Sequence, residues 1–306
     1  MASLWMLYAS FAFAAMGAGV KLASEFYSTS ELLMYRGLIG TLILLFMVRR
    51  QGGTFKTDFG KAHLWRSLVG VTSLWLWFFA IGRLPLATAM TLNYMAPIWI
   101  AAGMFVMGWW TKTKHAEWPL VVAIASSFFG VTMVLQPAVE SNQWLGGLAG
   151  VCSSMISAMA YMQVRKLGQL GEPEYRVVFY FSLTTTLVGL VATLAGDGPQ
   201  GALFHAHTAY GFVLLLGIGS AALIAQMCMT RAYRVGKVLV VANLQYTGIV
   251  FSTLWGLILW GDAFDWHVWL GIGVILLSGL AATFYNTRKT ARGAVVKDQD
   301  PVVSES

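Results

Sequence analysis

Two groups of polar residues lie inside long apolar runs of this 306-residue chain, and they are the side chains best placed to bind a ligand. The first group is Asn93, Tyr94 and Pro97, near the middle of the uncharged run 84–110. Proline lacks a backbone N–H, and inside a helix its ring clashes with the carbonyl four residues earlier, here that of Asn93. We therefore expect a helix over this run to kink or open, leaving a carbonyl beside amide and hydroxyl side chains.

The second group is Asn243, Gln245 and Tyr246, which lies in the apolar run 237–260. Moving the sequence by 151 residues places RLPLATAMTLNYMAP over RVGKVLVVANLQYTG, so that Pro97 matches Gly248. An unpaired carbonyl in apolar surroundings costs several kcal/mol, so each opening needs a polar partner. Two matched interruptions favour one shared, water-accessible cavity. The alternative is a pair of kinks that shape helix packing, with the amide group bonded to a neighbouring helix.

Arg36 is the basic residue that falls within an apolar segment, about six residues from its end. On membrane insertion scales a charge there costs at least about 2.5–3.5 kcal/mol unless it is paired or hydrated. Its two-pronged guanidinium suits a carboxylate or phosphate of a ligand. The alternatives are a side chain that extends to the nearer membrane surface, or an ion pair with Glu25 or Glu31.

Three further side chains, Trp75, Gln163 and Gln226, are candidates for the wall of a cavity. Trp75 belongs to SLWLWFFAIG (73–82), whose aromatic rings cover most of a helix circumference, so that one or two of them can face a cavity. The two glutamines lie in apolar surroundings, where hydrogen bonds between helices are the alternative to ligand contacts.

The composition indicates that these residues lie in a membrane. The chain is 58% hydrophobic and 11% charged, whereas soluble domains carry roughly 25% charged residues. Apolar segments of about 20 residues recur, and each is long enough to cross the hydrocarbon core. We expect ten transmembrane helices, approximately at 3–21, 30–48, 64–82, 84–109, 117–137, 144–164, 175–195, 209–230, 237–260 and 266–286.

The distribution of Lys and Arg sets the orientation of these helices, because basic residues concentrate on the cytoplasmic side. With both termini cytoplasmic, sixteen of the 20 basic residues fall in inner loops or the tail, while Arg66 sits at the inner end of the third helix. The net charge of +7 is therefore a topology signal, and we expect no nucleic-acid partner.

Ten helices divide into two sets of five, and because five is odd the second set must enter the membrane from the opposite side. Such inverted repeats place a binding site at the midplane between the halves. We expect repeats at 1–138 and 139–287 and a disordered cytoplasmic tail at 288–306.

None of the thirteen Asp and Glu residues lies deep in a predicted span. A buried, titrating carboxylate is the usual group for proton coupling and for holding a cationic ligand. Its absence favours neutral, zwitterionic or anionic ligands and leaves Glu31 and Asp262, at the outer ends, as the remaining proton carriers.

The chain resembles the drug/metabolite transporter superfamily, and within it the EamA-type bacterial branch. The resemblance covers residues 3–286 and rests on LLMYRGLIG (32–40), FFAIGRLPLATAMTLNYMAPIW (78–99) and NLQYTGIVFSTLWGLILWGD (243–262). The chain departs from the family by ending the last motif in Gly-Asp instead of Gly-Glu. In MGWWTKTKHAEW (107–118) it also lacks the acidic residue that the family often places after the fourth helix.

The resemblance implies a secondary transporter of the bacterial inner membrane that moves a small polar or amphipathic metabolite by alternating access. We favour export of an amino-acid-like, zwitterionic or anionic compound. The alternatives are uptake of a vitamin or nucleoside-like compound of the riboflavin or S-adenosylmethionine type, and, from another class, a passive channel or a membrane interaction protein. The expected partners are the metabolite, the lipid bilayer and at most a second copy of the chain.

The sequence predicts no enzyme and no cofactor. It contains no phosphate-binding loop, zinc-protease helix or nucleophile elbow. His205 and His207 imitate a metal pair, but we expect them to be solvated in an outer loop without further ligands.

Overall fold

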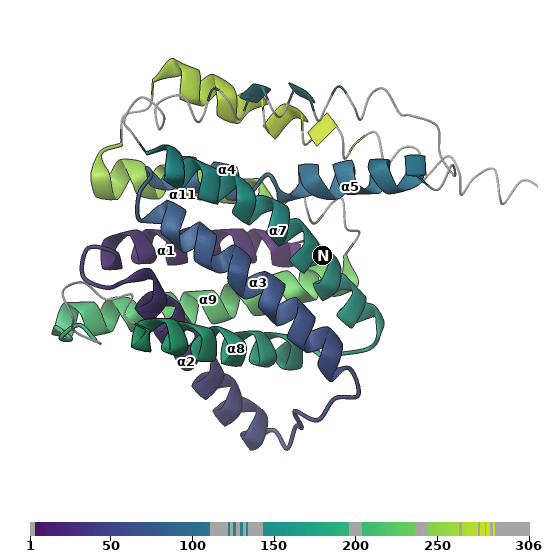
Figure 1. Cartoon of the computed structure of the whole chain (residues 1–306), viewed down its shortest axis with the longest axis vertical. Coiled ribbons are helices and arrows are strands. Elements are labelled where there is room, and N and C mark those ends of the chain that lie inside the picture. Colours follow the sequence, from purple (N-terminus) through teal and green to yellow (C-terminus); the bar gives the residue numbers. More distant parts are fainter. Residues whose placement is uncertain are drawn as a thin grey trace, which may run out of the picture.

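The computed structural model describes residues 4–110, 143–195, 204–236, 244–262 and 265–274, with single positions between 122 and 133, at 241 and between 276 and 284. Within these residues the chain is helical and has no strand (Figure 1). The helices with defined bounds are α1 (Trp5–Ala23), α2 (Thr29–Arg50), α3 (Gly60–Ile81), α4 (Leu86–Asn93), α5 (Ala96–Trp110), α7 (Trp144–Gln169), α8 (Glu174–Leu194), α9 (Ala209–Val235) and α11 (Thr247–Trp260).

Six of these helices, α1, α2, α3, α7, α8 and α9, are long and apolar enough to cross a membrane. Their bounds lie within a few residues of the predicted spans, because a continuous apolar run in lipid can satisfy its backbone only as a helix. Most of the predicted span 117–137 and the whole tail 288–306 lie outside the described residues. The total of ten helices and the cytoplasmic position of both termini therefore stay predictions.

The predicted helix 84–109 is interrupted as expected, and forms two helices, α4 and α5. Tyr94 has φ −76° and ψ 9°, outside the helical region, and its N–H still reaches the carbonyl of Met90 at 2.9 Å. The next N–H, that of Met95, bonds to Leu92 at 3.2 Å, a tighter three-residue turn. The helix restarts at Ala96, so that Pro97 lies in the first turn of α5, where its missing N–H costs least.

The helices of the N-terminal part pack mainly against those of the C-terminal part. The closest pairings are α1 with α9, α3 with α7 and α2 with α8. Suppose that α1 is exchanged with α7, α2 with α8 and α3 with α9. The pair α1–α9 then becomes α7–α3, and the pair α2–α8 becomes itself. The same exchange relates the contact of α2 with α9 to that of α3 with α8. Two inverted repeats would produce such an exchange of helices, and the repeats at 1–138 and 139–287 stay a prediction.

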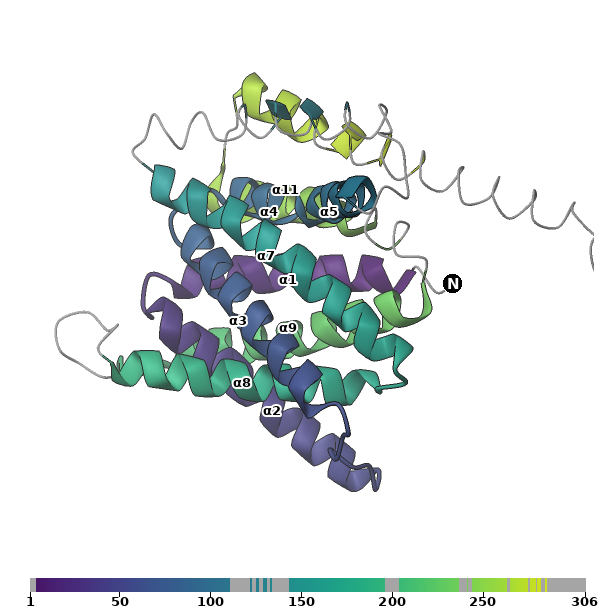
Figure 2. The ribbon, with the colours of Figure 1, turned by 45° about the vertical axis from the view of Figure 1, so that its right-hand side comes forward.

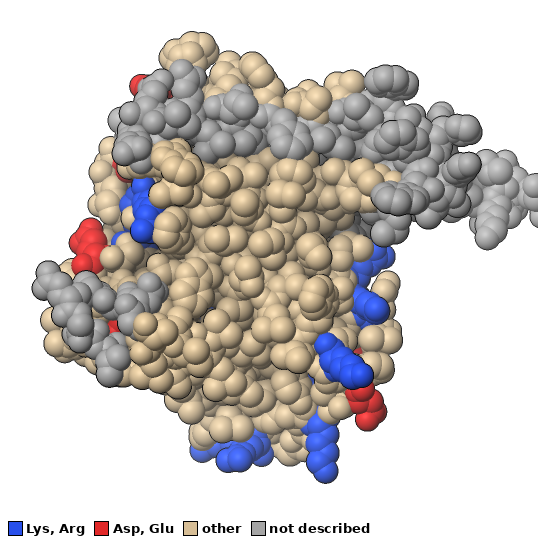
Figure 3. All heavy atoms as spheres, viewed as in Figure 1, with Lys and Arg blue, Asp and Glu red and all other residues tan. Residues whose placement is uncertain are grey.

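The broken helices lie on one side of the bundle. In Figures 1 and 2, α4, α5 and α11 lie in the upper part of the bundle and α2 and α8 in the lower part, with α1 between them. The face of the molecule drawn in Figure 3 has a broad area without Lys, Arg, Asp or Glu, between edges that carry them. Large apolar side chains are exposed on the described helices, such as Ile258, which is 72% exposed. This surface suits contact with lipid chains.

One end of the bundle is held by a buried carboxylate. Glu31 lies in the first turn of α2, where it and Ser28 form a reciprocal capping box. Its carboxylate also accepts bonds from His205, at 2.9 Å from the backbone N–H and 2.5 Å from Nδ1. The hydroxyls of Tyr27 and Tyr35 lie 3.0 and 2.9 Å from the ring nitrogens of His207. His207 is exposed as expected, whereas His205 is partly buried against Glu31. Both rings tie the segment before α9 to the corner between α1 and α2, which the sequence did not indicate.

The other end of the bundle carries a second buried carboxylate, that of Glu172 between α7 and α8. It accepts bonds from Thr57 at 2.8 Å and Arg176 at 3.1 Å, and lies 3.1 Å from Nε2 of His63. Burial alone raises the pKa of the Glu172 carboxyl, but the hydrogen bonds from Thr57, Arg176 and His63 outweigh it, so the pKa lies below its usual value. The carboxylate therefore joins the loop between α2 and α3 to the corner between α7 and α8.

Replacing Glu172 by Gln should destabilise the protein by about 2–4 kcal/mol, because Arg176 and His63 lose their buried acceptor. Folding lowers the pKa of Glu172, so the ionised carboxylate stabilises the folded protein. This contribution to the free energy of unfolding is complete above the pKa of the unfolded state. It is lost as the pH falls through the pKa of the folded state. Thermal unfolding in detergent should therefore show a gap between the two proteins at neutral pH that narrows in acid.

Glu174→Gln is the matched control for this measurement. It removes a more exposed ion pair with Arg234, and such pairs contribute about 0–1 kcal/mol. Equal destabilisation by the two variants would contradict the structural role of Glu172.

Candidate functional site

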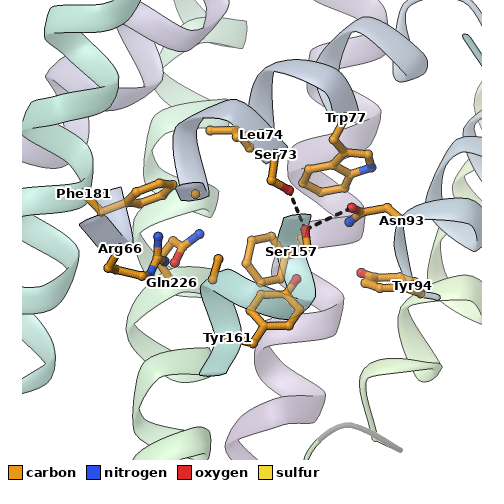
Figure 4. Close-up of a pocket in the computed structure, with 13 residues that line it drawn as sticks. Arg66, Ser73, Leu74, Trp77, Asn93, Tyr94, Ser157, Tyr161, Phe181 and Gln226 are labelled. Atoms are coloured by element: carbon orange, nitrogen blue, oxygen red, sulfur yellow. Dashed lines mark hydrogen bonds between the residues drawn. The ribbon is translucent and has the colours of Figure 1, made fainter. Parts of the chain in front are cut away.

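A cavity lies between helices of both parts of the chain (Figure 4). Its lining residues come from α1, α3, α4 and the break after α4 in the N-terminal part, and from α7, α8 and α9 in the C-terminal part. The space open to the centre of a water molecule is about 40 Å³, room for about three waters. A metabolite is larger than that, so helices or side chains must move before one can enter.

A hydroxyl and amide network forms one wall of the cavity. The hydroxyl of Ser73 on α3 lies 2.5 Å from that of Ser157 on α7, and the Ser153 hydroxyl lies 3.0 Å from Oδ1 of Asn93. Ser157 donates to the same Asn93 oxygen at 3.5 Å (Figure 4). Asn93 is therefore bonded to a neighbouring helix and also lines the cavity, so that the two interpretations left open by its sequence position both describe it.

Several polar atoms on the cavity wall have no hydrogen-bond partner among the described residues. They are the Tyr94 hydroxyl, the Trp77 indole nitrogen, Oε1 of Gln226, and Nε and Nη1 of Arg66. Figure 4 shows Arg66 and Gln226 on one side of the cavity and Asn93 and Tyr94 on the other. A buried polar atom without a partner costs about 1–3 kcal/mol. These atoms are buried in this structure, and water or a ligand would supply their missing partners once the cavity opens.

Tyr94 also joins the two interrupted helices. It is 1% exposed, and a Cβ on Gly248 would collide with its ring and hydroxyl. Gly248, at the start of α11, therefore lets the aromatic ring lie directly on its backbone. This close approach gives a packing reason for glycine at the position that matches Pro97.

Gln245 and Tyr246 lie behind the cavity wall, because neither is among its lining residues. Nε2 of Gln245 donates to the hydroxyl of Tyr161 at 3.0 Å, and Tyr161 itself lines the cavity and stacks on Tyr233. The backbone before α11 also has a partner, because the Ser10 hydroxyl donates to the carbonyl of Leu244 at 3.3 Å. Protein groups thus satisfy part of this second interruption.

The other candidates occupy different places. Arg36 is 3% exposed, and its guanidinium carbon lies 5.2 Å from the centre of the Phe181 ring. It neither extends to the surface nor pairs with Glu31. Trp75 and Gln163 are half-buried and Pro97 is buried, and none of the three lines the cavity. Asn243 lies outside the described residues.

Sequence reasoning missed Arg66 and Trp77 as lining residues. The predicted third span begins at residue 64, which places Arg66 at a membrane surface, but α3 begins at Gly60 and Arg66 lies in its second turn. Trp77 lines the cavity and Trp75 does not, because they point to different sides of α3. In the sequence, Arg66 is a basic residue next to a long uncharged run. This pattern fits an arginine at the membrane surface as well as a buried one.

The described lining of the cavity contains a cation and no carboxylate. The four ion pairs among the described residues involve Glu31, Glu172 and Glu174, all at the ends of helices. No group of three or more metal-binding side chains gathers in the described part of the chain. The cavity therefore combines hydrogen-bonding groups and aromatic rings with one positive charge.

Replacing Gly248 by Ala should destabilise the protein by about 1–3 kcal/mol, because the new methyl group displaces the Tyr94 ring from a packed position. Gly217→Ala is the matched control, since Gly217 lies within α9 with no atom near its added Cβ, and alanine there should be neutral or slightly stabilising. Thermal unfolding of both variants in detergent tests this, and equal stability would show that the Tyr94–Gly248 contact is not tight.

Comparisons with known proteins agree with this architecture. Residues 1–136 match the model of the EamA-like transporter family. The chain is 30% identical to the pseudopaline exporter CntI of Pseudomonas aeruginosa, over 86% of this chain and 88% of the relative. It is 26% identical to a riboflavin transporter of Vibrio cholerae, over 95% of each chain. A solved crystal structure with 17% identity shares the fold, with a TM-score of 0.62 over 90% of this chain and 96% of the other.

Proposed function

The chain belongs to the EamA-like transporter family, and on that premise we propose that it moves a small polar or amphipathic metabolite across the membrane by alternating access. It is a multi-pass protein of the bacterial inner membrane and a transporter rather than an enzyme. The single observation that carries the proposal is the central cavity. It lies between helices of both parts of the chain, and its wall holds buried polar atoms without partners.

The two ends of the bundle supply the closures that alternating access needs. At one end Glu31 of α2 holds His205, and at the other Glu172 before α8 holds His63 of α3. We call these two contacts, Glu31–His205 and Glu172–His63, the closures. They correspond to one another when α2 is exchanged with α8 and α3 with α9. We propose that each closure opens in turn while the other stays bonded, so that the cavity faces one side at a time.

Export is the direction we favour, because the exporter of Pseudomonas aeruginosa is 30% identical over most of both chains. The second candidate is uptake of a vitamin-like compound, which the similarity to a riboflavin transporter supports. Counterflow in proteoliposomes with a metabolite panel, with and without a pH gradient, identifies the substrate and shows whether protons are coupled.

Tyr94→Phe should lower transport roughly 3- to 10-fold, the loss expected for one neutral hydrogen bond to a substrate. Tyr8→Phe is the matched control, because Tyr8 is 65% exposed on α1 and does not line the cavity. Initial rates of counterflow, corrected for protein content, test this. Unchanged transport by Tyr94→Phe would remove this hydroxyl from the binding site.

The closures can be tested with a reporter cysteine in the cavity, Ser157→Cys, in a chain whose Cys152 and Cys228 are replaced by alanine. Adding His205→Ala should raise labelling by an impermeant maleimide from the side of the corner between α1 and α2. Adding His63→Ala should raise labelling from the opposite side. Inside-out and right-side-out vesicles separate the two directions, and equal labelling from both sides in each variant would contradict independent closures.

A further inference from the structure

We propose, on the basis of the proposed function, that Arg66 anchors a carboxylate of the transported compound. Arg66 is 2% exposed in the second turn of α3, and it lines the cavity. Its Nε and Nη1 have no hydrogen-bond partner among the described residues. The described carboxylates lie more than 4 Å away, since the ion pairs of the structure do not include Arg66. A buried guanidinium without an anion is costly, and a bound carboxylate removes that cost.

The surroundings of Arg66 hold the guanidinium in place without neutralising it. Its central carbon lies 4.3 Å from the centre of the Phe181 ring, a cation–π contact. A Cβ on Gly70, one turn later on α3, would collide with Nη1, so the missing side chain of this glycine leaves the space that the guanidinium occupies. The position of Arg66 is therefore built by α3 itself and by the ring on α8.

A second buried cation strengthens the preference for a negative ligand. Arg36 on α2 approaches the same Phe181 ring at 5.2 Å, and Arg36 has no carboxylate partner among the described residues either. The two guanidinium groups thus raise the positive potential at this end of the cavity. The described residues of the cavity wall include no carboxylate that would hold a cationic compound in competition.

The geometry of the donors favours a carboxylate over a neutral polar group. A guanidinium presents parallel N–H donors that match the two oxygens of a carboxylate, and two such bonds orient the ligand. The unpaired Oε1 of Gln226 lies on the same side of the cavity (Figure 4) and can accept a hydrogen bond from a second polar group of the same compound. The substrate class is therefore a small carboxylate with a further hydrogen-bonding group.

Matched pairs of ligands in which the amide has no carboxylate left test this assignment: succinate with succinamide, lactate with lactamide, and N-acetylglycine with its amide. Binding to purified protein is measured by thermal shift, and transport by counterflow. At least one acid should bind at least about tenfold more tightly than its amide. Arg66→Gln should remove that advantage, a loss of about 10- to 100-fold for the acid. Arg66→Lys should retain part of it, because lysine keeps the charge but loses the paired donors.

Arg50→Gln is the matched control, because it removes an exposed arginine at the end of α2 and should leave the acid preference unchanged. If Arg66→Gln does not fold, Arg66→Lys decides, and equal acid affinity in that variant overturns the assignment. Acid binding that survives in folded Arg66→Gln overturns it, as does a wild-type protein that binds none of the acids. If only neutral compounds show saturable transport, the role of Arg66 is contradicted and the proposed function stands. If no metabolite in the wider panel shows saturable transport, the proposed function is contradicted.

Discussion

A helix that is interrupted inside a membrane must find hydrogen-bond partners within the protein, because lipid offers none. Ser10 of α1 supplies one such partner, because it donates to the carbonyl of Leu244 just before α11. The two interrupted segments also pack on one another, since Tyr94, at the break between α4 and α5, lies on the backbone of Gly248 at the start of α11. The interruptions are therefore stable because other helices cover them, and the cavity lies next to them.

The cost of burying a charge without a partner also explains where the charged side chains lie. Buried carboxylates occur at helix ends, where loops and caps supply several donors, as for Glu31 and Glu172. Buried arginines lie further inside, where the described structure gives them an aromatic ring and no anion. If Arg66 binds a carboxylate as proposed, a negative ligand would stabilise a bundle that has paired charges at its ends and an unpaired cation further inside.

Helix pairing connects the cavity to the ends. Glu31 lies in α2, which packs on α8, and Glu172 lies just before α8. Because α8 lines the cavity, both carboxylates are connected to its wall. In the proposed alternating access, movement of one group of helices against the other would loosen one carboxylate–histidine contact before the other. The proposal thus assigns a similar closure to each end of the bundle.

The sequence by itself determined the helices and the place where one of them breaks, because both depend on neighbouring residues. Continuous apolar runs specify helices in lipid, and Pro97 removes a hydrogen bond wherever the helix packs. It also indicated that Asn93, Tyr94 and Gln226 are polar groups in apolar surroundings, and these residues line the cavity. The function of a transporter followed from the family motifs.

Only the tertiary structure decided which side chains meet. It selected Trp77 over Trp75, placed Gln245 behind Tyr161, and made Arg66 a cavity residue instead of a surface one. It joined His205 to Glu31 across 174 residues of sequence. The physical reason is that the direction of a side chain on an apolar helix depends on how the helix is rotated against its neighbours. That rotation is set by packing between distant segments, such as α3 on α7, and a local pattern of residues does not contain it.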